Sequence, residues 1–458
     1  NSLETHNLAS ADDGYNTAVG YNSGLSVTTG IYNTLVGALS GDALTDADNN
    51  VALGWGTLST DTLGSRSVAI GRSALQSQNF TTATDAYNVA VGYSAGNAVT
   101  TGTLNTLVGG LAGDAITTGT NNNAFGYDSL GATTEGQFNN AFGEAALLSN
   151  TTGSSNIAMG GSALRNNTDR SNNTAIGESS LRENVNGARA TAVGSGSLQN
   201  QNPSTDTDTY NVAVGYHAGN DVTTGTQNVA VGGLALDAAT TGASQTALGY
   251  NALGADTKGQ NSVAVGHNAL ATQNLTTATN TYNVAVGSQA GLVISTGTEN
   301  TLIGGLSGDA ITTGASNVAL GVSSLGANTV GSKTVAIGNQ ALTAQNYGTA
   351  TDSFNTAVGF QAGLSVTTGI ENTIVGGRAG DALTDADFNV VVGQGALSAD
   401  TLGSKSVAIG AGTLNVQNFT TATDTFNTAV GHVAGGSITT GIRNSILGGE
   451  AADALTDA

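Results

Sequence analysis

A short apolar stretch that ends in glycine recurs along the whole chain. Examples are NTAVG at 16–20, NTLVG at 33–37 and NVAVG at 88–92. The residue before the glycine is large and apolar, the residue before that is usually Ala, and Val or Thr often precedes the Ala. Alternation with a period of two is typical of a β-strand. We therefore predict a short strand before each glycine, with one β-branched face and one small face of Ala and Gly.

These glycines are evenly spaced. There are 25 of them, including Gly20, Gly37 and Gly54, and they are separated by 17 residues in 19 of 24 intervals and by 21 residues in the other five. Such a period is typical of a solenoid, in which each coil packs on its neighbours. We predict an all-β fold, a parallel β-solenoid (β-roll) of about 25 coils, as one continuous array over residues 1–458 within a longer fibre. At about 4.8 Å per coil the array would extend on the order of 120 Å.

One large apolar side chain is supplied per coil from either of two positions. Where the fourth residue after the glycine is Leu, as at Leu58, the seventh is polar or Ala, as at Asp61. Where the fourth is Gly, as at Gly24, the seventh is apolar, as at Val27. The third residue is Ala, Ser or Thr in all 25 coils. A single interior slot explains this exchange, because an empty slot would leave a cavity and two large side chains would overpack it.

Asparagine occupies the position four residues before the glycine in 19 of the 25 coils, including Asn16, Asn33, Asn50, Asn88 and Asn105. Stacked coils would place these amides about 4.8 Å apart, where they can bond to one another as a ladder. N-glycosylation is disfavoured, because several of these residues match the acceptor pattern only through the repeat. The turns that precede them, such as 28–30, carry Gly30 or, in long coils, residues such as Asp85, and we expect a positive φ there.

The five 21-residue coils each add four residues at the same place, giving polar loops at 77–86, 200–209, 272–281, 344–353 and 416–425. Aromatic residues lie in or just after these loops, and a row of them could contact glycans at a host surface. We favour the alternative that they pack back onto the coils. The candidates for glycan contact are Phe80, Tyr87, Tyr210, Tyr282, Tyr347, Phe354, Phe419 and Phe426.

An acidic motif occurs twice, as Asp42, Asp46 and Asp48 and again as Asp381, Asp385 and Asp387. Carboxylate oxygens are the ligands that Ca²⁺ prefers. The motif lacks the Gly-Gly-x-Gly-x-Asp spacing of calcium-binding rolls, so an acidic turn facing solvent is the favoured interpretation. We expect no cofactor, with Ca²⁺ as the weak alternative.

Composition narrows the classes of function. The 458 residues include no Cys, which excludes disulfides and thiolate chemistry, and the formal net charge of −21 disfavours a nucleic-acid partner. No apolar run approaches the ~20 residues of a membrane span. The four histidines, His6, His217, His267 and His432, are scattered, and we find no nucleophile with a base, phosphate loop or paired catalytic carboxylates. We therefore expect a protein that is not an enzyme.

Repeats such as NTAVGYNSG at 16–24 and SVAIGRSAL at 67–75 resemble the head repeats of trimeric autotransporter adhesins and the Asn-Thr-Ala-x-Gly shafts of phage tail fibres. The resemblance covers nearly the whole chain and implies a β-roll with three chains side by side. The coil is longer than the adhesin head repeat, and the chain lacks the neck, heptad stalk and membrane barrel of those adhesins.

The thin coil leads independently to self-association. A lone roll with a 17-residue coil would expose apolar or Ala-rich faces, so we expect the Ala/Gly face to be buried in a homotrimer rather than in a dimer or a monomer. The leading function is the extracellular shaft of a phage tail fibre or similar virion appendage. The alternative is a bacterial surface adhesin or extracellular filament. An ice-binding solenoid needs ranks of alternating Thr on a flat face. It is disfavoured, because the Thr pairs of this chain are adjacent in sequence and are interrupted in some coils.

Overall fold

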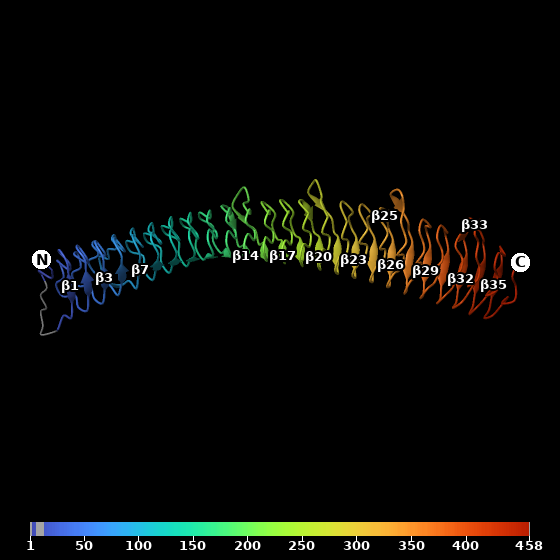
Figure 1. Cartoon of the computed structure of the whole chain (residues 1–458), viewed down its shortest axis with the longest axis horizontal. Helices are drawn as coiled ribbons and strands as arrows, with labels where there is room; N and C mark the ends of the chain where they lie inside the picture. Colours follow the sequence, from blue (N-terminus) through green and yellow to red (C-terminus); the bar gives the residue numbers. More distant parts are fainter. Residues whose placement is uncertain (1, 6–12, 458) are drawn as a thin grey trace. The chain divides into compact units, whose positions relative to one another are not determined.

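The computed structural model describes residues 2–5 and 13–457, and in this part of the chain it contains strands and turns but no helix. Figure 1 shows the strands of successive coils stacked within each unit. They pair in parallel with a 17-residue offset in the short coils, so that Thr17 lies beside Thr34 and Ala18 beside Leu35. The predicted parallel β-solenoid of about 25 coils is confirmed. The chain divides into two compact units, Asn1–Gln227 and Asn228–Ala458. The prediction of one continuous array stays a prediction.

The first unit carries one strand of the main ladder in each coil. Its main strands are β1 (Thr17–Val19), β2 (Thr34–Val36), β3 (Val51–Leu53), β5 (Val68–Ile70), β7 (Val89–Val91), β8 (Thr106–Val108), β9 (Asn123–Phe125), β10 (Asn140–Phe142), β11 (Ile157–Met159), β12 (Thr174–Ile176), β14 (Thr191–Val193) and β16 (Val212–Val214). Each long coil adds a two-residue strand that pairs with the coil before it. These pairs are β4 (Gly64–Ser65) with β6 (Thr84–Asp85) and β13 (Gly187–Ala188) with β15 (Thr207–Asp208).

The second unit repeats this arrangement. Its main strands are β17 (Val229–Val231), β18 (Thr246–Leu248), β20 (Val263–Val265), β22 (Val284–Val286), β23 (Thr301–Ile303), β24 (Val318–Leu320), β26 (Val335–Ile337), β28 (Thr356–Val358), β29 (Thr373–Val375), β30 (Val390–Val392), β32 (Val407–Ile409), β34 (Thr428–Val430) and β35 (Ser445–Leu447). The short pairs are β19 (Gly259–Gln260) with β21 (Thr279–Asn280), β25 (Gly331–Ser332) with β27 (Thr351–Asp352) and β31 (Gly403–Ser404) with β33 (Thr423–Asp424).

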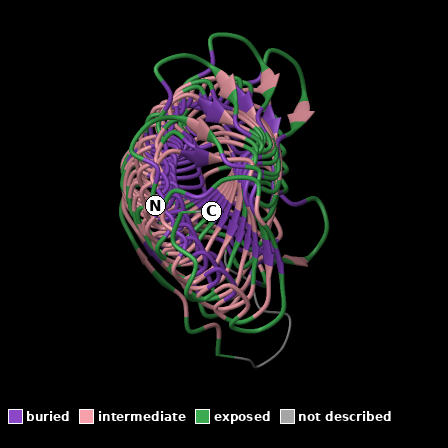
Figure 2. Ribbon diagram, turned by 90° about the vertical axis from the view of Figure 1, so that its right-hand side faces the viewer, coloured by how far each residue is buried: buried purple, intermediate pink, exposed green. Residues whose placement is uncertain are grey.

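The middle residue of each main strand points into the coil. It is usually Ala, and Ala52, Ala124 and Ala264 have no exposed surface. The expectation that the Ala/Gly face lies on the outside, to be buried by other chains, is therefore wrong. The coil is so thin that its opposite side covers this face. The first and third residues of each strand point outward instead. Figure 2 shows the buried residues on the inside of the coils and exposed residues in the projecting loops.

The interior slot has a third contributor that sequence reasoning missed. Leu58 and Val27 are both fully buried, as the exchange between the two positions predicts. Where two consecutive coils have Gly at the fourth position, the intervening strand carries Leu or Ile instead of Ala at its centre. A Cβ on Gly24 or Gly41 would lie within 2.9 Å of a Leu35 methyl carbon, so this leucine fills the space that the two glycines leave. The same substitution occurs at Leu107, Leu302 and Ile374.

The glycines that follow the strands form a column in which backbones meet directly. Gly20 has a φ of +137°, and a Cβ on it would lie 2.4 Å from the carbonyl oxygen of Gly37. The turn glycine Gly30 is different. It does not have the positive φ that we expected, and it is required because a Cβ would lie 2.4 Å from the carbonyl oxygen of Ala47 in the next coil. Asp85 likewise has no positive φ.

Candidate functional site

The asparagines before the strands form a continuous hydrogen-bonded ladder in the short coils. The backbone N–H of Asn105 donates to Oδ1 of Asn88 at 3.0 Å, and its Nδ2 donates to the carbonyl oxygen of Gly119 at 2.9 Å. Each side chain therefore accepts from the next coil and donates to a turn of its own coil. Asn33, Asn50, Asn88 and Asn105 are fully buried. This arrangement satisfies polar groups that burial would otherwise leave unpaired.

The ladder is rebuilt at each long coil by a glutamine. The position of the asparagine is taken by Ser67, Ala190, Ser262, Thr334 or Ser406 wherever a long coil begins. In the first of these coils Nε2 of Gln78 donates to Oγ of Ser67 at 3.1 Å, and Oε1 accepts from Nδ2 of Asn88 at 2.9 Å. Equivalent glutamines accept from the following asparagine in the other four, at Gln201, Gln273, Gln345 and Gln417.

A buried acid or amide from the preceding coil accepts from the glutamine in four of these clusters. Asp400 is fully buried, and its Oδ2 accepts from Nε2 of Gln417 at 2.6 Å while Oδ1 accepts the backbone N–H groups of Gly403 and Phe419. Burial raises the pKa of Asp400, and also that of the equivalent Asp256. Asn184 and Asn328 occupy the same position before two other long coils. The cluster therefore functions structurally with either a carboxyl or an amide.

Four long coils carry a surface clasp made of a cation, an aspartate and an aromatic ring. Nη1 of Arg189 lies 2.9 Å from Oδ2 of Asp208, and its guanidinium lies 5.7 Å from the centroid of the Tyr210 ring. The same contacts join Arg66 to Asp85 and Tyr87, Lys333 to Asp352 and Phe354, and Lys405 to Asp424 and Phe426. In the fifth, Asn261 takes the position of the cation and donates to Asn280 at 2.8 Å.

The eight predicted glycan-contact residues fall into two groups. Phe80, Tyr347 and Phe419 are at least 93% buried, and burial raises the pKa of Tyr347 to about 12. Their rings pack back onto the coils. Tyr87, Tyr210, Tyr282, Phe354 and Phe426 are about half exposed, but in four of them a cation lies over the ring. For Tyr282 no overlying cation is found among the described residues, and Asn261 takes the position of the cation and donates to Asn280.

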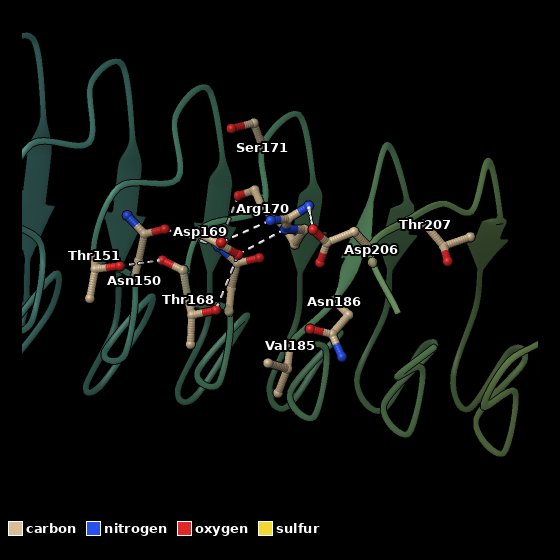
Figure 3. A network of polar contacts seen from close by, with 12 residues as sticks. Asn150, Thr151, Thr168, Asp169, Arg170, Ser171, Val185, Asn186, Asp206 and Thr207 are labelled. Atoms are coloured by element: carbon tan, nitrogen blue, oxygen red, sulfur yellow. Dashed lines mark hydrogen bonds and ion pairs between the residues drawn. The ribbon is translucent and has the colours of Figure 1, made fainter. Parts of the chain in front are cut away.

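A salt-bridge network ties the loop of a long coil to coils that come before it. Arg170 donates to both carboxylate oxygens of Asp169 at 2.8 Å, and its Nη1 lies 3.1 Å from Asp206 in the 200–209 loop (Figure 3). The bidentate contact with Arg170 lowers the pKa of Asp169. Arg170 therefore joins Asp169 of its own coil to Asp206 of the loop through two ion pairs.

The acidic motifs do not converge on a common point. Oδ1 of Asp48 accepts the backbone N–H of Ile31 at 2.8 Å, and Asp46 accepts the hydroxyl of Thr29. Asp42 lies apart, partly buried, with one carboxylate oxygen that has no hydrogen-bond partner, and burial raises its pKa. Asp385, Asp387 and Asp381 repeat these placements. Within residues 2–5 and 13–457 no group of three His, Asp or Glu side chains is suited to hold a metal ion.

Two of the histidines stack on tyrosine rings. His217 stacks on Tyr216 and His267 stacks on Tyr250, while His6 lies outside the described residues. Among the residues described, no helix is long and apolar enough to cross a membrane. No family model and no curated protein matches this chain, so its repeats and their geometry carry the functional argument.

Proposed function

We propose that this chain is a structural spacer, the extracellular shaft of a phage tail fibre or similar virion appendage that positions host-attachment elements. The observation that carries the proposal is the repetition of one hydrogen-bond pattern, the asparagine ladder, in coil after coil. A stack of equivalent coils resists bending, because each coil is bonded to the next by strand, side chain and turn. The proposal includes self-association into a homotrimer and neither an enzymatic activity nor a cofactor.

The periodicity of the loops supports a spacer in particular. In the second unit a long coil follows every three short coils, so that a block of 72 residues can be removed without disturbing the register. Deletion of residues 305–376 joins Gly304 to Gly377, and the resulting sequence GGRAGDA matches the native pattern GGLSGDA at 304–310. We expect this deletion to shorten the purified particle by about 19 Å, four coils at about 4.8 Å each, as seen by electron microscopy.

A second deletion serves as the control. Removal of residues 305–340 deletes 36 residues, which is not a whole number of coils. The asparagines after the deletion are therefore out of register with those before it, and the unfolding midpoint should fall sharply. If the deletion of 305–376 left the particle length unchanged, or destabilised the chain as much as the control does, the spacer function would be wrong. Immunogold labelling of virions and of bacterial surfaces with antibodies to the chain distinguishes a phage fibre from a surface adhesin.

The alternative of a surface adhesin is favoured by one observation, the half-exposed Tyr282 ring, for which no overlying cation is found among the described residues. If the long coils bind glycans, Tyr282→Ala should reduce binding on a glycan array at least tenfold, whereas Phe354→Ala, where Lys333 covers the ring, should change it less than twofold. Equal binding by both variants and the natural chain would remove the support for an adhesin.

A further inference from the structure

The outer strand face of each unit is uncharged and carries a column of apolar side chains. We give this name to the first and third residues of every main strand, which point away from the coil interior. The third residue is large and apolar in every main strand, and the first is Val or Ile in 12 of the 25 strands and Thr, Asn or Ser in the others, so none of these residues is charged. Met159, Leu248 and Leu320 are each more than 40% exposed. These side chains lie in columns, because the strands pair in register.

Aromatic residues flank this face in some of the coils. The residue after the strand glycine is an exposed tyrosine in five of the 25 coils, among them Tyr21, Tyr93 and Tyr127, whereas three other coils carry Arg72, Glu144 or Glu178 there. The residue five before the glycine adds exposed rings such as Tyr32 and Phe138. Tyrosine and phenylalanine are enriched where proteins meet, because they bury a large area at a low entropic cost.

The area is large enough for a stable interface. The strands of the first unit span on the order of 60 Å along the stack, and three strand residues are about 10 Å wide. Their product is on the order of 600 Å² per unit, and the two units of one chain together offer about twice that. Monomeric proteins rarely expose a contiguous apolar patch above a few hundred Å². A specific protein interface buries about 800 Å² on each partner.

The distribution of charge identifies the partner as a further copy of the chain. The formal net charge is −21, yet the outer strand face carries none of it. Because these strand residues carry no carboxylates, two copies can meet on this face without repulsion between its side chains. The acidic turns stay in solvent. The spacing between coils is also the same in every copy, so the columns of one copy stay in step with those of another along the whole face.

We propose that the outer strand face binds the same face of further copies of this chain, in parallel and in register. The proposal rests on the side-by-side assembly of the proposed shaft. The bulkiest third residues, Phe125, Phe142 and Met159, come from three consecutive strands, and the two phenylalanine rings stack at 4.7 Å. The strands on either side carry Val or Ile at this position. When each coil meets the same coil of another copy, the bulky side chains of all copies lie at one level.

Charge substitution tests whether this face associates. We expect the double variant Ile303→Asp and Leu320→Asp to reduce the mass in solution to that of one chain, 44.8 kDa, with an unchanged β circular dichroism spectrum. The matched control is Thr313→Asp in an exposed turn, where Asp46 and Asp385 occupy equivalent positions naturally. The control should keep the mass of the natural chain. An oligomer that persists in the double variant overturns the proposal.

Disulfide trapping tests the register, because the chain contains no cysteine of its own. In a parallel, in-register assembly Leu320→Cys brings identical residues together, and mild oxidation should link most chains in pairs within the oligomer. Thr313→Cys should give at most a tenth of that yield. A natural chain that is monomeric at all concentrations, or equal yields from both cysteines, overturns the proposal. The shaft function is judged separately by the length of the charged variant's particle, which should stay unchanged if the single chain is the spacer.

Discussion

The short and the long coils satisfy the same buried groups with different residues. In a short coil one asparagine accepts from the next coil and donates to a turn of its own coil, as Asn105 does. In a long coil four extra residues precede the turn, the asparagine is replaced by a smaller residue, and Gln78 reaches the site from another part of the coil. The comparison shows that the solenoid conserves the pattern of bonds and not the residue that makes them.

The interior slot should be equally important in both kinds of coil. Leu325 belongs to a short coil and Leu342 to a long one, and both are fully buried. Truncation of either residue to Ala should lower the free energy of unfolding by about 3 kcal/mol, because each leaves a cavity in a core only one coil thick. Denaturant unfolding of the full chain measures both. A much smaller loss for Leu342→Ala would mean that the core is interrupted at long coils.

Removal of the glutamine should match the removal of an asparagine. Gln417→Ala deprives Asp400 and Asn427 of a partner, and Asn389→Ala deprives the carbonyl oxygen of Gly403 and the N–H of Ser406. We expect each to cost about 2 kcal/mol of unfolding free energy, since buried polar groups lose their bonds. The exposed Gln394→Ala is the control and should stay within about 0.5 kcal/mol of the natural chain. A negligible effect of Gln417→Ala would refute the inference that a glutamine takes over the role of the ladder asparagine in long coils.

The acid and amide versions of the cluster should differ in their response to pH. Burial raises the pKa of Asp400 above its ordinary value of about 3.9. Its contribution to stability is therefore full below about pH 4 and is lost as the pH rises through the folded-state pKa. Asp400→Asn should remove this decline, and Asn328→Asp should introduce a similar one. Unfolding midpoints measured from pH 4 to pH 8 check both, and parallel profiles for all three chains would contradict the prediction.

The surface clasps should contribute least. Lys405→Ala removes an ion pair with Asp424 and a contact with the Phe426 ring, and it should cost less than about 1 kcal/mol because both groups are solvated. The loss should diminish in high salt. Asn261→Ala removes the neutral version, and its effect should not depend on salt. Midpoints in low and high salt compare the two, and a loss at Lys405 of several kcal/mol would show that the clasps hold the long coils in place.

Sequence reasoning predicted the period, the strands and the interior slot, because these depend on residue types that recur at fixed spacing. It did not predict which strand face is inward, because Ala at 52 or 264 fits either a tight core or a close contact between chains. The link between Gln78 and Asn88 was also missed. A signal was present, since all five long coils begin without the asparagine and carry a glutamine seven residues after the strand glycine.

The asparagine ladder has a direction, and this bears on how the chain acquires its structure. Oδ1 of Asn122 accepts the backbone N–H of Asn139 in the next coil, and Oδ1 of Asn139 accepts that of Asn156. During synthesis each finished winding therefore presents an unfilled acceptor to the segment that emerges next from the ribosome. The nascent chain can lengthen by successive templating, one winding at a time, without bringing distant segments together.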